Sequence, residues 1–121
     1  MRTRLYICLL FVFLGIAEAS RYIPFEATAY CQYGITKAGT LPHRGTVAAD
    51  PDVLPLGTRI RVANAGRYSG EYVVTDTGGK VTGRHIDLFI PWRAVALKFG
   101  RKKVLVSVVR WGPGRVGPSG G

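Results

Sequence analysis

The stretch VVTDTGGKVTGRHIDLFIP, residues 73–91, contains the pattern that decides the fold. Two runs rich in β-branched and apolar residues, which are typical of strands, are joined by a connection with three glycines. Asp76 ends the first run, and Asp87 lies near the start of the second. Burial raises the pKa of a carboxylate and a nearby donor or positive charge lowers it, so two carboxylates in different surroundings can serve as acid and base. The stretch therefore predicts two strands that carry a candidate pair of catalytic carboxylates.

The N-terminal segment has the features of a secretory signal peptide. Arg2 and Arg4 precede an apolar run at residues 5–16, and AEA at 17–19 fits a small-x-small cleavage pattern. The run is shorter than the roughly 20 residues that span a bilayer as a helix, although an uncleaved membrane anchor is the alternative interpretation. We therefore expect residues 1–19 to be removed. The mature protein would then be secreted, periplasmic or associated with the cell wall, with no stable membrane anchor.

The charge of the chain favours anionic partners. Its 121 residues include 17 Lys and Arg against 7 Asp and Glu, which gives a net charge of +10. Removal of residues 1–19 takes away two arginines and one glutamate and leaves +9. For a secreted protein, anionic partners would be envelope polymers, phospholipid surfaces or acidic glycans, unless the charge mainly provides solubility. Nucleic acid is not expected as a partner, because the sequence has no recognition motif for it.

Cysteine and histidine usage predicts neither a disulfide nor a metal site. Cys31 would be alone after loss of the signal peptide, so it has no intramolecular partner. We interpret Cys31 as a small buried apolar residue, and the alternative is a nucleophile that would need an activating base nearby. No Cys and His spacing typical of zinc sites occurs, and we expect neither a metal nor any other cofactor.

Alternation and turn residues predict the remaining elements. Strands are expected at residues 21–32, 58–62, 70–76, 86–90 and 103–111. The last of these is apolar on both faces and is therefore expected to be central. One short helix is expected to begin at Pro91 and to end at a Gly100 cap. Residues 33–51 are interpreted as a long loop, of a kind that often carries a binding surface.

Together these elements predict an all-β protein of about six short strands with one short helix. A closed barrel removes exposed strand edges better than an open sheet does, and we expect one. The domain is expected to cover residues 20–111. Residues 112–121 are rich in Gly and Pro and are expected to form a disordered tail.

Three aspartates are flanked by glycine, proline or small residues: Asp50 in AADP, Asp76 in TDTGG and Asp87 in HIDLF. Together with FEATAYC, ITKAGT, LPLGTRIRV, GGKVTGRHIDLF and AVALKFGRKKVLV, they make the chain resemble the 3D domain, a family named for its three aspartates. The resemblance covers residues 25–109. It implies a six-stranded double-psi β-barrel, the fold shared by the catalytic part of membrane-bound lytic transglycosylase A, the rare lipoprotein A family and expansins.

The same resemblance implies roles for individual residues. Asp87 matches the general acid of those relatives, and Asp76 matches the neighbouring aspartate that shapes the cleft. Asp50 matches the first aspartate of the family, whose role would be structural, and Thr28 matches a threonine that lines the cleft. The candidate substrate-binding residues are Thr28, Asp50, Thr77, Gly78, Gly79, Lys80 and Arg84. His85 is expected to point away from Asp87, because adjacent side chains on a strand face opposite ways.

The implied chemistry is cleavage of the bond between N-acetylmuramic acid and N-acetylglucosamine in peptidoglycan. A carboxylic acid kept protonated by an apolar site can deliver a proton to the leaving oxygen, and we expect Leu88, Phe89 and Val74 as walls around Asp87. A hydrolase would add a second carboxylate to position water. A lytic transglycosylase instead uses the C6 hydroxyl of the muramic acid, and Asp87 would act first as acid and then as base.

Other interpretations stay open at this point. Asp76 could simply start a turn by accepting backbone N–H bonds, Asp87 could be purely structural, or the three carboxylates could bind a divalent cation. The chain could also be a non-catalytic, expansin-like module that binds and loosens glycans. Arg59, Arg61, Arg84 and Lys80 would then hold an anionic wall. A secreted effector or inhibitor would leave no signature here. We expect a monomer whose partners are peptidoglycan glycan strands or other anionic envelope polymers.

Overall fold

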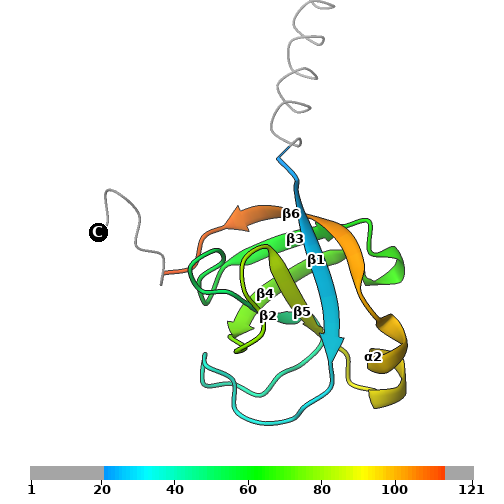
Figure 1. Ribbon diagram of the computed structural model, residues 1–121. Coiled ribbons are helices and arrows are strands. Elements are labelled where there is room, and N and C mark those ends of the chain that lie inside the picture. Colours follow the sequence, from blue (N-terminus) through cyan, green and yellow to red (C-terminus); the bar gives the residue numbers. More distant parts are fainter. Residues whose placement is uncertain (1–20, 114–121) are drawn as a thin grey trace, which may run out of the picture.

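The computed structural model describes residues 21–113, which form a barrel of six strands with a helix at its side (Figure 1). The strands are β1 (Ile23–Tyr30), β2 (Thr46–Ala49), β3 (Arg59–Ala63), β4 (Gly70–Asp76), β5 (His85–Phe89) and β6 (Lys102–Arg110). The α-helix is α2 (Arg93–Phe99), and a 3-10 helix, η1, covers Gly66–Tyr68. Neither described helix is long and apolar enough to cross a membrane. The expected signal peptide at residues 1–19 lies outside the described residues.

The barrel is closed by hydrogen bonds around its whole circumference. The order of strands is β1-β5-β2-β4-β3-β6, and β6 pairs back onto β1. The pairs β1–β5 and β2–β4 are parallel, and the other four pairs are antiparallel. Closure leaves no strand edge unpaired. The prediction of an all-β protein, a six-stranded double-psi β-barrel with one short helix, is confirmed.

One side of each strand fills the barrel with apolar side chains. The most buried residues are Ala27 on β1, Val47 on β2, Ile60 on β3, Val74 on β4, Ile86 and Leu88 on β5, and Val104 and Val106 on β6. Full burial of a Val, Leu or Ile side chain contributes about 1.5–3 kcal/mol. Because side chains alternate along a strand, the residues between these core positions, including Thr28 and Asp87, lie on the outer surface.

Strand β2 lies within the segment 33–51, so the interpretation of that whole segment as a loop is wrong for residues 46–49. All four residues of β2 are buried. A strand of four buried residues shows no alternation of apolar and polar side chains, and it is too short to give a periodic signal. Its place in the barrel comes instead from its neighbours, β5 on one side and β4 on the other.

The helix begins later than the sequence predicts. Its first residue is Arg93 rather than Pro91, and Trp92, with an extended backbone, is its N-cap. The buried residues of the helix are Ala96 and Phe99. Gly100 ends the helix with φ 67°, as expected for a residue without a Cβ.

Strand β6 has neighbours on both sides, β1 and β3, but it is not buried on both faces. Val104 and Val106 are in the core, whereas Val109 is 49% exposed. The sequence pattern is apolar on both faces, and the structure shows that one of them faces outward. The expectation that this strand is central agrees with its pairing on both sides, although one of its faces is exposed.

The glycine-rich connection, residues 77–84, joins β4 to β5 by passing over β2, which lies between them. Val81 is buried, and its N–H donates to the carbonyl oxygen of Gly78 at 3.0 Å. A Cβ on Gly78 would approach Cγ2 of Val81 to 2.8 Å, so this packing requires a glycine. The N–H of Gly83 donates to Oδ2 of Asp50 at 2.8 Å. The connection is thus a barrel crossover fixed at two points.

Gly112, which the sequence places in the tail, packs against the turn before β3. Its N–H donates to Oγ1 of the fully buried Thr58 at 3.1 Å. A Cβ at Gly112 would lie 2.1 Å from the carbonyl oxygen of Leu56, and this clash could be relieved only by a shift of the backbone. Residues 114–121 lie outside the described residues, and the disordered tail stays a prediction for them.

We expect Gly112→Ala to lower the free energy of unfolding by about 1–3 kcal/mol, because the added methyl group overpacks a site closed by backbone. Gly34→Ala is the matched control, since a Cβ at Gly34 meets no atom within 4 Å, and it should change stability by no more than about 0.5 kcal/mol. Urea unfolding followed by circular dichroism measures both. Equal stabilities of the two variants would contradict the packing described here.

Candidate functional site

Four neighbouring strands place the two predicted catalytic aspartates in one row on the outside of the barrel. Thr28 on β1 pairs with Asp87 on β5. Asp87 pairs in turn with Ala48 on β2, and Ala48 pairs with Asp76 on β4. Since neighbouring strands lie about 4.8 Å apart, the Cα atoms of the two aspartates are roughly 10 Å apart. The carboxylates therefore share one surface, with a small side chain between them.

A β-bulge in β4 turns Asp76 toward this surface. From the pair made by Val74 to the pair made by Asp76, β4 advances by two residues while β2 advances by one. The extra residue is Thr75, and an extra residue of this kind re-aims the side chains that follow it. Val74 is buried in the barrel, whereas Asp76 lines the same hollow as Asp87.

Asp87 is a half-buried carboxyl group with one side-chain hydrogen bond. Oγ1 of Thr28 donates to its Oδ1 at 3.0 Å. Burial raises the pKa of Asp87, while the hydrogen bond from Thr28 and the positive charge of His85 act in the opposite direction. A carboxyl group with a raised pKa keeps its proton closer to neutral pH, which is what a general acid requires.

His85 lies on the same face of β5 as Asp87, so the expectation that it points away is wrong. The two residues are two positions apart, and side chains two positions apart on a strand share a face. Nε2 of His85 lies 2.8 Å from Oγ1 of Thr28. Because the hydroxyl proton of Thr28 goes to Asp87, the histidine donates to the threonine from Nε2. The three side chains form a hydrogen-bonded chain, His85 to Thr28 to Asp87.

The walls expected around Asp87 are only partly the right ones. Leu88 and Val74 are buried inside the barrel and cannot line the outer surface. Phe89 does lie near the site, because its ring packs edge-on against Tyr30 with the centroids 5.5 Å apart. The error for Leu88 follows from alternation, since a residue adjacent to an outward-facing aspartate faces the core.

Two adjoining hollows open beside Asp87. The smaller, of about 130 Å³, is lined by Tyr30, Gln32, Ala48, Asp76, Thr77, Gly78, Val81 and Asp87. The larger, of about 360 Å³, is lined by Ala29, Tyr30, Cys31, Gln32, Asp87, Arg93, Ala96 and Leu97. Tyr30, Gln32 and Asp87 line both hollows, so the carboxyl group of Asp87 is accessible from either. We call these two hollows together the cleft.

Tyr30 is a site residue that the sequence analysis misses. Its hydroxyl is buried and has no hydrogen-bond partner among the described residues. Burial, together with the negative charges of Asp76 and Asp87, raises the pKa of Tyr30 to about 12. The hydroxyl therefore stays protonated, while other parts of Tyr30 line both hollows. The alternation of side chains along β1 could have identified Tyr30 from the sequence, because Tyr30 lies two positions after Thr28 and shares its face.

Asp76 accepts backbone N–H groups, as expected for a residue that starts a turn. Its Oδ1 accepts the N–H of Thr77 at 2.9 Å and the N–H of Lys37 at 3.2 Å. The N–H of Ala38 donates to the carbonyl oxygen of Thr75 at 2.9 Å. These bonds hold the β1–β2 loop, which extends below the barrel in Figure 1, against the edge of the cleft.

Asp50 lines neither hollow of the cleft. Its Oδ2 accepts the N–H of Gly83 and its Oδ1 accepts the N–H of Asp52, at 2.8 and 2.9 Å. These two backbone hydrogen bonds lower the pKa of Asp50. In residues 21–113 no three His, Cys, Asp or Glu side chains come close enough to hold a metal ion. The three aspartates are thus spread over the barrel and do not form a cation site.

The remaining predicted residues divide into two groups. Thr77 and Gly78 line the smaller hollow. Gly79 and Lys80 are exposed and line neither hollow of the cleft. Arg84 lines a separate hollow of about 210 Å³ with Pro24, Phe25, Glu26 and Lys103. The structure therefore gathers Asp76, Thr77, Gly78 and Asp87 at the cleft, and Thr28 lies beside it through its hydrogen bond to Asp87. Asp50, Gly79, Lys80 and Arg84 lie away from the cleft.

The family model of the 3D domain matches residues 45–110, and the chain belongs to the 3D domain family. The cell wall-binding protein YocH of Bacillus subtilis is 36% identical over 101 residues, which cover 76% of this chain and 34% of YocH. The SPbeta prophage-derived protein YorM of Bacillus subtilis is 33% identical over 90 residues, covering 66% of this chain and 37% of YorM. The chain spans about a third of the length of these relatives.

Solved structures share the fold at low sequence identity. MltA from Escherichia coli superposes with a TM-score of 0.51 at 22% identity, over 69% of this chain and 28% of MltA. An expansin from Clavibacter michiganensis superposes with a TM-score of 0.55 at 18% identity, over 74% of this chain and 51% of the expansin. The Streptomyces papain inhibitor superposes with a TM-score of 0.57 at 20% identity, over 75% of this chain and 96% of the inhibitor. A glycan-cleaving enzyme, an expansin and a protease inhibitor thus share this barrel, so the fold alone does not define an activity.

We expect Thr28→Val to raise the pKa of Asp87 further, because the hydrogen bond from Thr28 is one of the two influences that lower it. A ¹³C NMR titration of the Asp87 carboxyl carbon measures this pKa directly. Thr77→Val is the matched control, a threonine in the same hollow whose side chain does not bond to Asp87. An unchanged titration midpoint in Thr28→Val would show that the hydroxyl does not act on the carboxylate.

The raised pKa of Asp87 predicts a dependence of stability on pH. The folded state holds this proton more tightly than the unfolded chain does. The resulting stability is fully present below the unfolded pKa of about 4 and is lost as pH rises through the folded pKa. Asp87→Asn cannot ionise and so does not lose this stability at high pH. The variant should therefore melt at a higher temperature than the wild type at pH 7. The difference in melting temperature between Asp87→Asn and the wild type should vanish below pH 4.

Asp50 should show the opposite sign, because its pKa is lowered in the folded state. Its contribution is present above the unfolded pKa and is lost as pH falls through the folded pKa. Asp50→Asn should therefore melt below the wild type at pH 7 and approach it in acid. Melting temperatures from pH 3 to pH 8 test both variants, with the exposed Asp52→Asn as control. The same sign for Asp87 and Asp50 would contradict their assigned environments.

Proposed function

We propose that this protein binds the glycan strands of peptidoglycan and cleaves them as a lytic transglycosylase, with Asp87 as the acid and then the base. The observation that carries the proposal is the half-buried Asp87 carboxyl, with a raised pKa and a hydrogen bond from Thr28, at the junction of two open hollows. A protonated carboxyl exposed to a groove is the minimum that protonation of a glycosidic oxygen requires.

The names of similar proteins support the substrate class and the location. YocH is named a cell wall-binding protein. MltA is a lytic transglycosylase that has been solved with bound chitohexaose, and it shares the barrel with a TM-score of 0.52 at 18% identity. The proposal extends these properties to the present chain, as a protein associated with the cell wall whose ligand is a glycan strand.

The reaction would proceed in two proton transfers at one residue. Asp87 donates its proton to the oxygen that links N-acetylmuramic acid to N-acetylglucosamine, and the bond from C1 of the muramic acid to that oxygen breaks. The C6 hydroxyl oxygen of the same muramic acid then bonds to C1, and its proton passes to the Asp87 carboxylate. The product carries a 1,6-anhydro ring, no water is consumed, and Asp87 ends the cycle protonated as it began.

Other side chains of the cleft would orient the substrate. Tyr30, which lines both hollows beside Asp87, would contact the sugar as part of the cleft wall. Thr28, held by Nε2 of His85, would keep the Asp87 carboxyl in one orientation.

A non-catalytic role in wall binding is the second candidate. It is favoured by the partial likeness to the solved enzyme, because the barrel corresponds to only 28% of MltA. Of the arginines expected to hold an anionic wall, Arg59 and Arg61 are engaged by Glu71 at 3.9 and 2.8 Å. Arg84 and Lys80 form no ion pair with a described residue, and they would carry that role.

The test is incubation of the purified protein with peptidoglycan sacculi, followed by mass spectrometry of the released material. We expect anhydromuropeptides from the wild type. Asp87→Asn should reduce the rate by about 100-fold or more, because general acid catalysis contributes 10²–10⁴-fold. Asp52→Asn, an exposed aspartate outside the cleft, should keep the wild-type rate. Sedimentation with sacculi is expected for all three proteins.

Retention on sacculi without any anhydro product would overturn the catalytic proposal and leave wall binding as the function. Full activity of Asp87→Asn would exclude Asp87 as the acid. Failure of the wild type to sediment with sacculi would exclude both candidates, and it would direct attention to a protein partner.

A further inference from the structure

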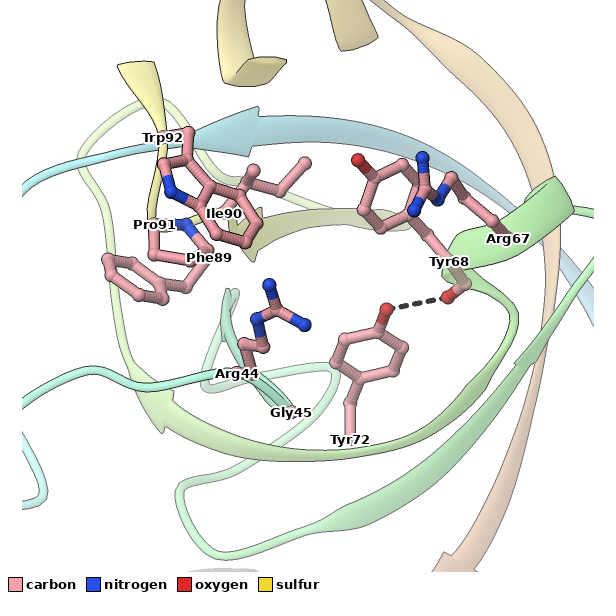
Figure 2. A pocket seen from close by; sticks show the side chains of 9 residues that line it. All are labelled: Arg44, Gly45, Arg67, Tyr68, Tyr72, Phe89, Ile90, Pro91 and Trp92. Atoms are coloured by element: carbon pink, nitrogen blue, oxygen red, sulfur yellow. Dashed lines mark hydrogen bonds between the residues drawn. The ribbon is translucent and has the colours of Figure 1, made fainter. Parts of the chain in front are cut away.

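A second pocket lies at one end of the barrel, away from the cleft. It has a volume of about 240 Å³ and is lined by Arg44, Gly45, Arg67, Tyr68, Tyr72, Phe89, Ile90, Pro91 and Trp92 (Figure 2). These residues come from the start of β2 and β4, from η1, and from the link between β5 and α2. None of them lines either hollow of the cleft. We call it the end pocket.

The end pocket is positively charged and its charges are not neutralised by carboxylates. Arg44 and Arg67 line it together, and no Asp or Glu does. Among the described residues, the arginines that form ion pairs are Arg59, Arg61 and Arg101. Two guanidinium groups that share a pocket without a counter-charge create a local field that favours an anion.

Each guanidinium group lies over an aromatic ring, within the distance of a cation–π interaction. Cζ of Arg44 lies 4.4 Å from the centre of the Trp92 ring, and Cζ of Arg67 lies 5.9 Å from the centre of the Tyr68 ring. Figure 2 shows Arg44 extending into the opening between Trp92 and Tyr72, with Arg67 and Tyr68 on the opposite side. A cation–π contact does not use the N–H donors of a guanidinium, so they can still form hydrogen bonds to a ligand.

The rest of the pocket is rigid and aromatic. The hydroxyl of Tyr72 donates to the carbonyl oxygen of Tyr68 at 2.5 Å, which fixes the two residues relative to each other. Tyr72 and Phe89 are buried, whereas Trp92 is 54% exposed at the rim. Such walls suit the carbon skeleton of a ligand, while the arginines suit its charge. The volume is below the roughly 300–1,000 Å³ of pockets for drug-sized molecules, so the ligand group is small.

From this arrangement we propose that the end pocket binds a phosphate ester carried on a sugar or polyol unit. The two guanidinium groups bind the phosphate oxygens from opposite sides of the opening, and the aromatic walls contact the carbon chain of the ester. A tetrahedral group with two or more charged oxygens can engage both arginines at once. This proposal does not depend on Asp87, because the end pocket and the cleft share no lining residue.

Glucose 6-phosphate is the probe, and the signals of the Trp92 indole N–H and of the Arg44 and Arg67 side chains are followed by NMR in the ¹⁵N-labelled protein. We expect saturable shifts at these three residues and none at Asp87. Glucose should give no shifts. Inorganic phosphate should bind at least about threefold more weakly than the ester, because it lacks the carbon skeleton that the walls contact.

Variants test the assigned arginines. Arg44→Gln and Arg67→Gln should each raise the Kd by about 10-fold, because each removes charge-assisted hydrogen bonds to the phosphate. Arg110→Gln, an exposed arginine on β6 outside the pocket, is the matched control and should stay within twofold of the wild type. Preserved dispersion of the amide spectrum shows that each variant is folded.

Several results would overturn the proposal. Absence of saturable shifts at Trp92 would exclude a phosphate site in the end pocket. Equal affinity for glucose 6-phosphate and glucuronate would show a general anion site rather than one for phosphate esters. Equal affinity for the ester and for inorganic phosphate would show that the walls make no contact. Loss of affinity in Arg110→Gln as large as in Arg44→Gln would reduce the effect to net charge.

Discussion

The parallel pairing of β1 with β5 is the constraint on which the cleft depends. It sets Thr28 opposite Asp87 and Glu26 opposite His85, so that outward-facing residues 59 positions apart in sequence meet. The same pair of strands contributes Ala27, Ile86 and Leu88 to the barrel interior. Packing on one side of the sheet therefore fixes the geometry of the hydrogen-bonded chain on the other. Because the barrel is closed, this register cannot slip without moving core residues to the outer face.

The three aspartates illustrate how surroundings separate residues of one type. Asp50 accepts two backbone N–H bonds, which lower its pKa and hold the crossover connection. Asp76 accepts two backbone N–H bonds on one oxygen and fixes the β1–β2 loop. Asp87 accepts no backbone N–H from residues 21–113, and burial is the largest influence on its pKa. Two of the aspartates thus serve the architecture of the site, and the third is the one left in a state suited to proton transfer.

Phe89 connects the two binding surfaces of the barrel. Its ring lines the end pocket and packs edge-on against Tyr30, which lines the cleft. Tyr30 and Phe89 therefore lie side by side, one at the cleft and the other at the end pocket. The two surfaces differ in chemistry, since the cleft presents carboxyl and hydroxyl groups and the end pocket presents guanidinium groups.

The sequence by itself determined the elements with strong local signals: the alternation of β1, the runs that form β4 and β5, and the helix that ends at Gly100. It did not determine β2, because four buried residues give no periodicity, nor the outward face of β6. The partners of Asp87 were decided by tertiary structure alone. The contact with Thr28 joins two strands far apart in sequence, and the bulge at Thr75 that turns Asp76 to the cleft exists only when β4 pairs with β2. Local sequence specifies which way a strand alternates, but only closure of the barrel specifies which side chains meet.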